Sequence, residues 1–298
     1  MRRFHPIFQE HRVKLGLIAI AILVIATTLV FLTTAFPLSR SGRLIAHLRN
    51  DDDEARHAAD ELGEIGPSAI PELLPLLSSS DASRRYWACA AIGNMRSRGS
   101  EGVPALIAAL SDGDDDVKAG AVSALQKIGI SALPAVPELI RLAAQTNNYL
   151  RLNAGVALWR ISHEPEPALH ILTNVVWVIE PYYQDRVIRV LSEMESEGLG
   201  AVPTLEAFRS VKNSRLRFAA LRARWRITAN GSNLVDDLSG FVTNKDDRYQ
   251  ELALELLGEI GPPASQSTQA VRIALQSGDL RIRRTARKAL LQIEGSKE

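Results

Sequence analysis

The 298-residue chain has a single cysteine and few aromatic residues. Because Cys89 has no second cysteine to pair with, an intramolecular disulfide framework is excluded and the redox compartment stays open. Aromatic residues make up 5% of the chain and hydrophobic residues 46%, mostly alanine, leucine, isoleucine and valine. This balance favours closely packed helices over a β-sandwich rich in tyrosine, phenylalanine and threonine.

Sequence motifs for nucleotide binding and hydrolysis are also missing. No GxGxxG, P-loop, GxSxG or HExxH pattern occurs in the chain. The formal net charge is only +1, and the absence of an overall basic bias argues against nucleic acid as a ligand. Cys89 is surrounded by alanines in the sequence, which fits a buried small hydrophobe better than a nucleophile.

One long uncharged segment stands near the start of the chain. Leu15 to Phe36 is a run of 22 residues without a charged side chain, and a helix needs roughly 20 residues to cross the hydrocarbon layer. The segment before it is basic, with Arg2, Arg3, Arg12 and Lys14 against Glu10. We therefore predict a transmembrane signal-anchor helix over residues 15–36, with residues 1–14 cytoplasmic and the remainder outside the cytoplasm.

A cleaved signal peptide is the alternative interpretation of this segment. Thr33 and Ala35 are small residues that could precede a cut before Phe36. The apolar core of a signal peptide is about 7–15 residues, so the length of the run favours an uncleaved anchor. Residues 37–43 contain proline, serine and glycine and are predicted to form a linker.

A repeat with a fixed period dominates the rest of the sequence. Apolar sites inside each block are spaced by three and four residues, as in Val117, Ala121, Ala124 and Leu125, which places them on one stripe of a helix. After a first interval of 30 residues, the apolar residues that close successive blocks are 33 apart. These closing residues are Ile65, Met95, Ile128, Ile161, Met194, Ile227, Ile260 and Ile293.

Turn signals divide each block into two helices. Prolines near the start of the first helix, where amides lack intrahelical partners, are Pro71, Pro104, Pro137 and Pro203. Polar residues able to cap the second helix are Asp112 to Asp116, Asn147 with Asn148, Asn213 with Ser214, and Asp246 with Asp247. Since one helical pair cannot bury its apolar face alone, we predict an all-α, right-handed α-solenoid of about seven to eight helical hairpins over residues 44–293, followed by a tail over 294–298.

The blocks DDDVKAGAVSALQKIG and DDDEARHAADELGEIG resemble the HEAT repeat, and the short period is similar to that of the phycobilisome-lyase-like subclass. The resemblance covers roughly Leu44 to Ile293. It implies an armadillo-like superhelix whose second helices line a concave face that commonly grips partners. The block from Val175 to Gly198 departs most, because Glu180 and Pro181 stand where a turn is expected and Met194 with Glu195 replaces the usual Ile-Gly pair.

Basic residues recur on one face of the second helices. Positions equivalent to Ser123 and Lys127 lie one helical turn apart, and in later repeats they carry Arg160, Arg189, Arg222, Arg226 and Lys288. Stacking would align these positions into a ladder. Glu193, Glu255 and Glu259 occur in the same rows, so a solvated face with ion pairs between repeats is the alternative interpretation.

The stretch from Arg209 to Arg226 contains no acid, and Arg224 occupies a position where other repeats have leucine. Its basic residues are Arg209, Lys212, Arg215, Arg217, Arg222, Arg224 and Arg226. Charge is also segregated along the chain, with a net charge of −7 from Leu44 to Glu138 and +3 from there to Glu298. We therefore predict that the C-terminal half meets an anionic partner, either an acidic protein face or lipid headgroups.

The candidate partner-binding residues are Arg160, Arg189, Arg215, Arg217, Arg222, Arg226, Lys288, Trp159 and Trp225. The two tryptophans share one repeat position, and for both of them core packing is the alternative to a role as binding anchors. His163 and Glu164 form a single His-Glu pair, whereas the HEAT-like deoxyhypusine hydroxylases bind iron through several. No carboxylate follows His47, His57 or His170, so we predict no metal, cofactor or catalytic residue.

The sequence leads to the prediction of a membrane-anchored scaffold or adaptor that binds a protein partner and has no chemistry of its own. One alternative is an enzyme of the HEAT-like lyase or hydroxylase kind. Another is a subunit required for the assembly of a membrane complex.

Overall fold

A computed structural model describes residues 39–49, 53–145, 147–244 and 248–295 of the chain. These residues form α-helices and short 3₁₀ segments without a β-strand. The predicted transmembrane segment Leu15 to Phe36 and the predicted caps Asp246 and Asp247 lie outside the described residues.

The described helices form eight successive pairs. The first helices of the pairs are α2 (Arg40–Ile45), α4 (Ile70–Leu73), α6 (Val103–Ala109), α8 (Val136–Gln145), α10 (Ala168–Val175), α12 (Val202–Ala207), α14 (Val235–Thr243) and α16 (Thr268–Ala274). The second helices are α3 (Asp53–Ile65), α5 (Ala82–Asn94), α7 (Asp115–Ile128), α9 (Asn148–Ser162), α11 (Pro181–Glu193), α13 (Ser214–Thr228), α15 (Gln250–Ile260) and α17 (Leu280–Ile293).

Most second helices are connected to the next pair by 3₁₀ segments, and two of these segments extend a first helix. They are η1 (Pro67–Ala69), η2 (Leu74–Ser78), η3 (Arg96–Gly102), η4 (Gly129–Ala135), η5 (Glu195–Ala201), η6 (Phe208–Ser210), η7 (Ser232–Leu234) and η8 (Pro262–Ser267). The predicted caps Asp114, Asn147 and Asn213 each accept a backbone N–H at the start of their helix. The residue types chosen from the sequence therefore begin these helices as expected.

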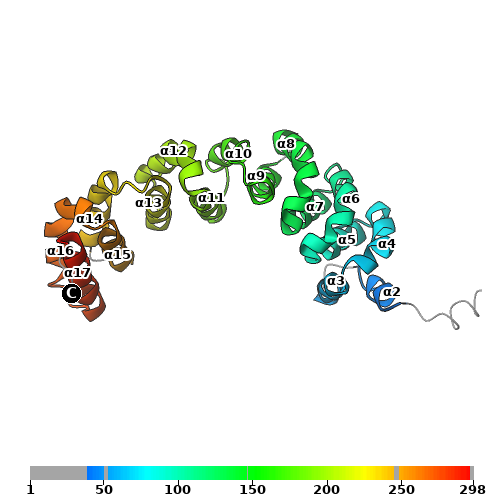
Figure 1. Cartoon of the computed structure of the whole chain (residues 1–298), viewed down its shortest axis with the longest axis horizontal. Coiled ribbons are helices and arrows are strands. Elements are labelled where there is room, and N and C mark those ends of the chain that lie inside the picture. The colour runs from blue at the N-terminus through cyan, green and yellow to red at the C-terminus, as the bar shows by residue number, and fades with distance from the viewer. Residues whose placement is uncertain (1–38, 50–52, 146, 245–247, 296–298) are drawn as a thin grey trace, which may run out of the picture.

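The pairs stack into an open arch (Figure 1). The second helices lie on the inside of the arch and the first helices on the outside, as Figure 1 shows most clearly for α8 to α13. The predicted α-solenoid is thus confirmed, and so is the expected position of the second helices on the concave face. The start of α2 and the end of α17 lie at opposite ends of the arch.

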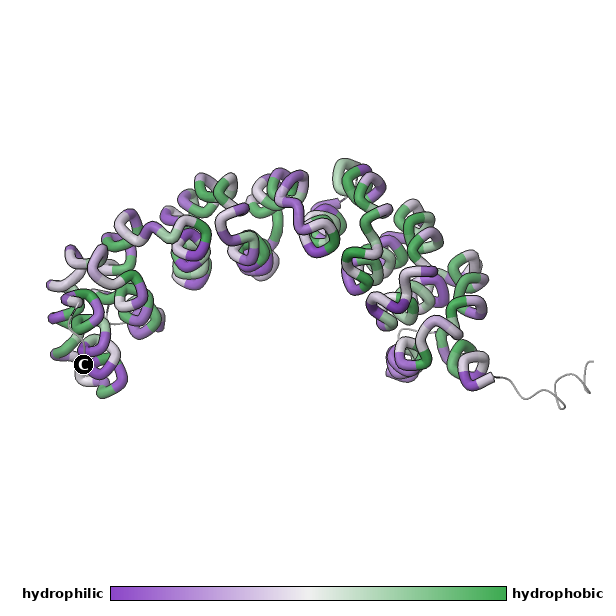
Figure 2. Tube along the Cα trace, in the orientation of Figure 1, coloured by the Kyte–Doolittle hydropathy of each residue, from purple (hydrophilic) through white to green (hydrophobic). Residues whose placement is uncertain are grey.

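The hydrophobic core runs between the inner and outer layers. In Figure 2 the inner helices α9, α11 and α13 turn hydrophilic residues toward the inside of the arch. The core falls into two clusters that meet at α13. Leu216 and Ala220 belong to the larger N-terminal cluster, and Phe218 and Leu221 belong to the smaller C-terminal cluster. Helix α13 therefore contributes one face to each of the two core clusters.

A recurrent side-chain clasp connects the two helices of a pair. Near the start of the second helix, an arginine or glutamine donates a hydrogen bond to a backbone carbonyl that follows or ends the first helix. The pairs are Arg85 to Ser79, Arg151 to Ala143, Gln184 to Val176, Gln250 to Val242, and Arg283 to Ser277. Because carbonyls at a helix end lack intrahelical partners, the clasp satisfies an acceptor that would otherwise need water.

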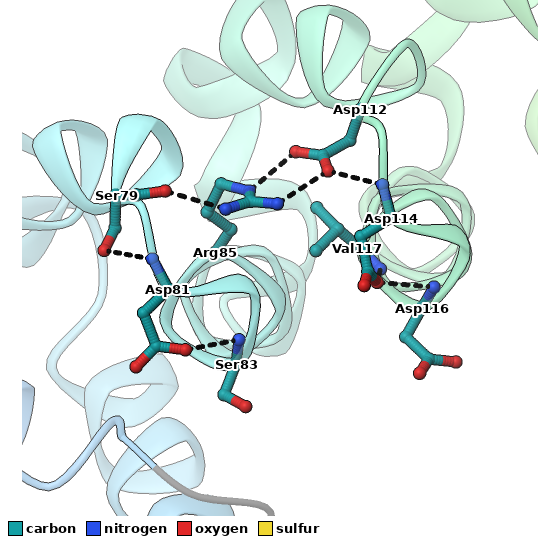
Figure 3. A network of polar contacts seen from close by, with 8 residues as sticks. All are labelled: Ser79, Asp81, Ser83, Arg85, Asp112, Asp114, Asp116 and Val117. Carbon is teal, nitrogen blue, oxygen red and sulfur yellow. Dashed lines mark hydrogen bonds and ion pairs between the residues drawn. The ribbon is translucent and has the colours of Figure 1, made fainter.

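At Arg85 the clasp extends into the next repeat (Figure 3). Its guanidinium donates to both oxygens of Asp112 at 2.7 and 2.8 Å, and Asp112 in turn accepts the backbone N–H of Asp114. The side chains of Arg85 and Asp112 are only 16% and 12% exposed. The hydrogen bond from Arg85 holds the pKa of Asp112 below its usual range, and Asp112 raises the pKa of Arg85.

The first described helix begins earlier than the sequence predicts. Helix α2 begins at Arg40, inside the segment predicted as a linker, because the Ser39 hydroxyl accepts the N–H of Gly42 and donates to Glu72 of the next repeat.

Among the described residues, Asp115–Ala144 is the one stretch long and apolar enough to cross a membrane by length and composition, with 44% of its apolar window buried. Because it consists of α7, η4 and α8 packed into the arch, we assign it to the core.

Candidate functional site: an arginine groove on the concave face

Helix α13 carries the densest group of arginines. Asn213 accepts the backbone N–H groups of Arg215 and Leu216 and so fixes where the helix begins. From that start, Arg215, Arg222 and Arg226 are spaced by seven and four residues and lie on one side of the helix. Arg217 and Arg224 are two residues further on from Arg215 and Arg222, which places them on the opposite side. The arginines of this acid-free stretch are therefore divided between two surfaces of α13.

The first surface is a groove of about 240 Å³ on the concave face, which we call the arginine groove. Its walls are formed by inner helices α11, α13 and α15. Its charged residues are Asp185, Arg189, Arg215, Arg222 and Arg226, and its other lining residues are Ile188, Ser192, Phe218, Ala219, Ala223, Tyr249 and Leu252. The structure therefore brings four of the predicted partner-binding arginines into one place.

Three of these arginines have no partner in the described part of the chain. Arg215 pairs with Asp185 at 3.1 Å, and this pair raises the pKa of Arg215. Arg189, Arg222 and Arg226 are exposed and form no hydrogen bond or ion pair with another described residue within the usual distances. The groove consequently presents three guanidinium groups to solvent above an apolar floor.

Tyr249 lines the groove, and three other tyrosines lie near the starts of α9 and α11. Tyr182 is 76% exposed and packs edge to face on Tyr183, which does the same on Tyr149. Tyr182 and Tyr249 are close enough to Arg215 to contribute to its raised pKa. Arginine and tyrosine are among the residues enriched at protein interfaces, because they combine contact area with directed polar groups.

The predicted ladder forms in part. Arg160 donates to Glu193 of the next repeat, and Lys127 donates to Asn94 of the previous one at 2.8 Å. Each of these bonds joins residues 33 positions apart, which is one repeat. Glu193 therefore neutralises Arg160 instead of Arg226. The alternative of inter-repeat ion pairs holds for Arg160 and Arg215, whereas Arg189, Arg222 and Arg226 form no ion pair with another described residue.

The second surface of α13 faces a hollow of about 290 Å³ beside the outer helices α12 and α14. Arg224 lines it and is only 4% exposed, with Nη2 at 2.8 Å from Glu206 and Nη1 at 3.9 Å from Asp237. Its Nε and Nη1 groups have no hydrogen-bond partner among the described residues. Arg209 pairs with Asp237, and Arg217 lies over the Phe241 ring with 5.3 Å between Cζ and the ring centroid. Arg217 is therefore separated from the groove.

The remaining candidates lie elsewhere. Trp159 is 7% exposed and belongs to the larger core cluster, with its ring edge to face against the exposed His163, and Trp225 is partly buried against the C-terminal core cluster. These positions favour core packing over a binding role. Lys288 is exposed on α17 at the end of the arch, away from the groove, and Lys212 is exposed in the turn before α13.

Histidine, cysteine and acidic side chains do not gather into a metal-binding cluster in the described part of the chain. Among the described residues no group of three or more His, Cys, Asp or Glu side chains could hold a metal ion. His163 ends α9 in a left-handed conformation with φ of 54°, and Glu164 follows it on the surface. Cys89 is fully buried, and burial raises the pKa of its thiol to about 12. The core-packing interpretation of Cys89 is confirmed.

Comparisons with known proteins agree with this architecture. Residues 43–126 and 70–159 match the family model of HEAT repeats, so the resemblance inferred from the sequence is confirmed for residues 43–159. No curated protein matches the chain in sequence.

Several solved structures are similar to the chain. An engineered protein is 21% identical over 87% of this chain and 79% of that one, with a TM-score of 0.52. A homology model of the full-length AP-3 complex in an intermediate open conformation is 14% identical over 84% of this chain and 50% of that one, with a TM-score of 0.64. The complex of CpcE and CpcF of phycocyanin lyase from Nostoc sp. PCC7120 is 25% identical over 75% of this chain and 94% of that one, with a TM-score of 0.46. The first two similarities concern the fold alone.

Proposed function

We propose that this HEAT-repeat chain is a non-catalytic scaffold, held at a membrane by residues 15–36, that binds a protein partner on its concave face. One observation carries the proposal: Arg189, Arg222 and Arg226 are exposed in a single groove of the inner helices and have no partner among the residues that the structure describes. Unpaired like charges held close together repel one another, and a bound anion would relieve that repulsion. The membrane position rests on the sequence, through its uncharged 22-residue run.

The extended architecture supports a scaffold more than an enzyme. Stacked repeats expose a long curved surface, and each repeat contacts mainly its neighbours. The described residues supply no metal-binding group and no reactive cysteine. A protein partner that follows the arch could therefore contact several repeats at once.

The lyase-like or hydroxylase-like alternative would require converging His-Glu pairs, and metal analysis of the purified full-length chain would detect a metal bound by such pairs. The assembly-subunit alternative predicts that the repeat domain purifies only together with companion subunits.

Photocrosslinking from defined positions tests this function. A photoreactive amino acid is placed in the full-length chain at Ser123 or Glu255 on inner helices, or at Ile140 or Ile273 on outer helices, all of them exposed. The proposal expects one crosslinked protein, in fixed proportion to the chain, from the inner positions only. Equal labelling from both layers, or crosslinks from the outer layer alone, would show that the concave face is not the binding surface.

The membrane position has its own test. Full-length chain should stay in the membrane pellet after alkaline extraction, whereas a chain lacking residues 1–38 should be released. Release of the full-length chain would remove the anchor from the proposal without affecting the concave surface.

A further inference from the structure

We propose that the arginine groove binds a short acidic segment of a partner protein in which two carboxylates flank an aromatic side chain. The inference rests on the proposed function and names the chemistry of the partner at the same surface. Arginine suits this role because its planar guanidinium can donate two parallel hydrogen bonds to one carboxylate.

The groove arginines are ready to accept such a ligand. Arg189, Arg222 and Arg226 form no hydrogen bond or ion pair with another described residue. A bound carboxylate would therefore replace water and would break no internal pair. Arg215 differs, since Asp185 already occupies it at 3.1 Å. We expect Arg215 to position the rim and to contribute less to binding.

The spacing of the arginines sets the spacing of the acids. Arg189 and Arg222 occupy equivalent positions one repeat apart, on neighbouring inner helices, and packed helices have axes about 8–10 Å apart. In a polyproline II segment, residues three apart face the same way and are about 9 Å apart. Two acids separated by two residues can thus reach both arginines. Arg226 is one turn beyond Arg222 and can share the second carboxylate.

The floor of the groove suits an aromatic residue between the acids. Phe218 and Ile188 are buried beneath it, and Leu252 is 39% exposed at its edge. Tyr249 stacks on Phe218 with 5.2 Å between the ring centroids. An aromatic side chain over this floor would bury apolar surface beside the ion pairs. A lipid headgroup has a phosphate but no aromatic ring beside it, so the floor favours a peptide.

Acids on α15 limit the length of the acidic segment. Glu255 and Glu259 occupy the same repeat positions as Arg222 and Arg226, one repeat further along, and both are exposed. Their charge opposes a long run of acids that would continue along the arch. We therefore expect two spaced acids to bind better than a polyacid of the same length.

Fluorescence anisotropy with the full-length chain in detergent tests the inference. The probes are labelled proline-rich peptides in which two glutamates flank a tryptophan, with the glutamates two, three or four positions apart in the sequence. The spacing of three should bind most tightly. Replacing both glutamates by glutamine should weaken binding by about tenfold or more, as should Arg222→Glu with Arg226→Glu.

A matched control and a charge swap give the result its specificity. Arg284→Glu with Arg287→Glu makes the same change of net charge on α17, where both side chains are exposed, and should leave binding unchanged. A peptide with lysines in place of the glutamates should bind the groove variant better than the wild-type chain. Circular dichroism of each variant excludes unfolding as the cause.

The contrary outcomes are distinct. Equal weakening by the groove and control variants would reduce the interaction to general charge attraction and overturn the inference. Groove-dependent binding of phosphatidylserine vesicles without peptide binding would assign the groove to lipid. If all peptides fail while crosslinks still form from the inner helices, the inference fails and the proposed function stands. If peptides bind as expected and no inner-helix crosslink forms, the scaffold function fails instead.

Discussion

At the scale of single residues, each second helix is followed by a residue with positive φ. Four of these residues are glycine, at Gly66, Gly129, Gly261 and Gly295, and the others are Arg96, His163, Glu195 and Ala229. A residue with a Cβ atom in the left-handed region costs roughly 1–2 kcal/mol. The non-glycine positions are thus places where the repeat accepts strain at a helix end.

We expect Glu195→Gly to raise the free energy of unfolding by about 0.5–1 kcal/mol, because it removes strain at a φ of 48°. The reverse change, Gly129→Ala at a φ of 75°, should lower it by about 1 kcal/mol. Urea denaturation of both variants measures the difference. Changes of the same sign at the two positions would contradict the explanation.

The Arg85 clasp predicts a dependence of stability on pH. Asp112 has a lowered pKa in the folded chain, so its contribution is present above its unfolded pKa and is lost as the pH falls through its folded pKa. The Asp112→Asn variant should therefore lose less free energy of unfolding than the wild-type chain when the pH falls below about 5. Arg85→Ala should cost about 2 kcal/mol at neutral pH, between the values for exposed and buried pairs. If the wild-type chain and Asp112→Asn lose stability in parallel on acidification, the pair does not contribute as described.

At the scale of helices, the sequence predicts register better than it predicts partners. The 33-residue period and the caps Asp114, Asn147 and Asn213 identify the second helices and where they begin. The clasp was not predicted, because arginine and glutamine fill the same position in different repeats and the acceptor is a backbone carbonyl without a sequence signal. The division of the α13 arginines between two surfaces could have been found from the 100° rotation per residue.

The burial of Arg224 gives a prediction for the stability of the chain at α13. Leucine occupies the equivalent position in neighbouring repeats, as Leu191 and Leu257 show, whereas Arg224 is buried with two N–H groups unsatisfied among the described residues. Arg224→Leu should raise the free energy of unfolding by about 1 kcal/mol, since replacing a poorly satisfied buried charge is often stabilising. Arg226→Leu, on the exposed side of the same helix, should change it by less than about 0.5 kcal/mol. A large loss of stability in Arg224→Leu would mean that the ion pair with Glu206 stabilises the packing of α13 against α12.

At the scale of the whole molecule, the arch has two bodies of core that meet at one helix. Stability in a solenoid is a sum of contributions from repeats and their interfaces, so a boundary between two core clusters allows the two sides to unfold separately. The smaller cluster, from Phe218 to Ile293, should exchange its backbone amides faster than the N-terminal cluster. Hydrogen exchange followed by mass spectrometry checks this order, and uniform protection along the arch would contradict it.

Charge is also distributed at this scale, with the acidic half of the chain at one end of the arch and the arginine groove toward the other. The polarity could be counted from the sequence. Which arginines remain unpaired could not, because pairing depends on where each carboxylate turns, as Glu193 turns to Arg160. The site is thus defined by the folded arrangement of acids as much as by the arginines themselves.

The central claim is that the arginine groove holds an anionic face of a protein partner. The most direct measurement is the affinity of the full-length chain for the partner identified by crosslinking, taken across a series of salt concentrations. We predict that affinity falls steeply with salt for the wild-type chain, because screening weakens ion pairs at a solvent-exposed surface. Arg222→Glu with Arg226→Glu should bind more weakly and with a shallower slope. An affinity that does not change with salt and is unaltered in this variant would contradict the claim.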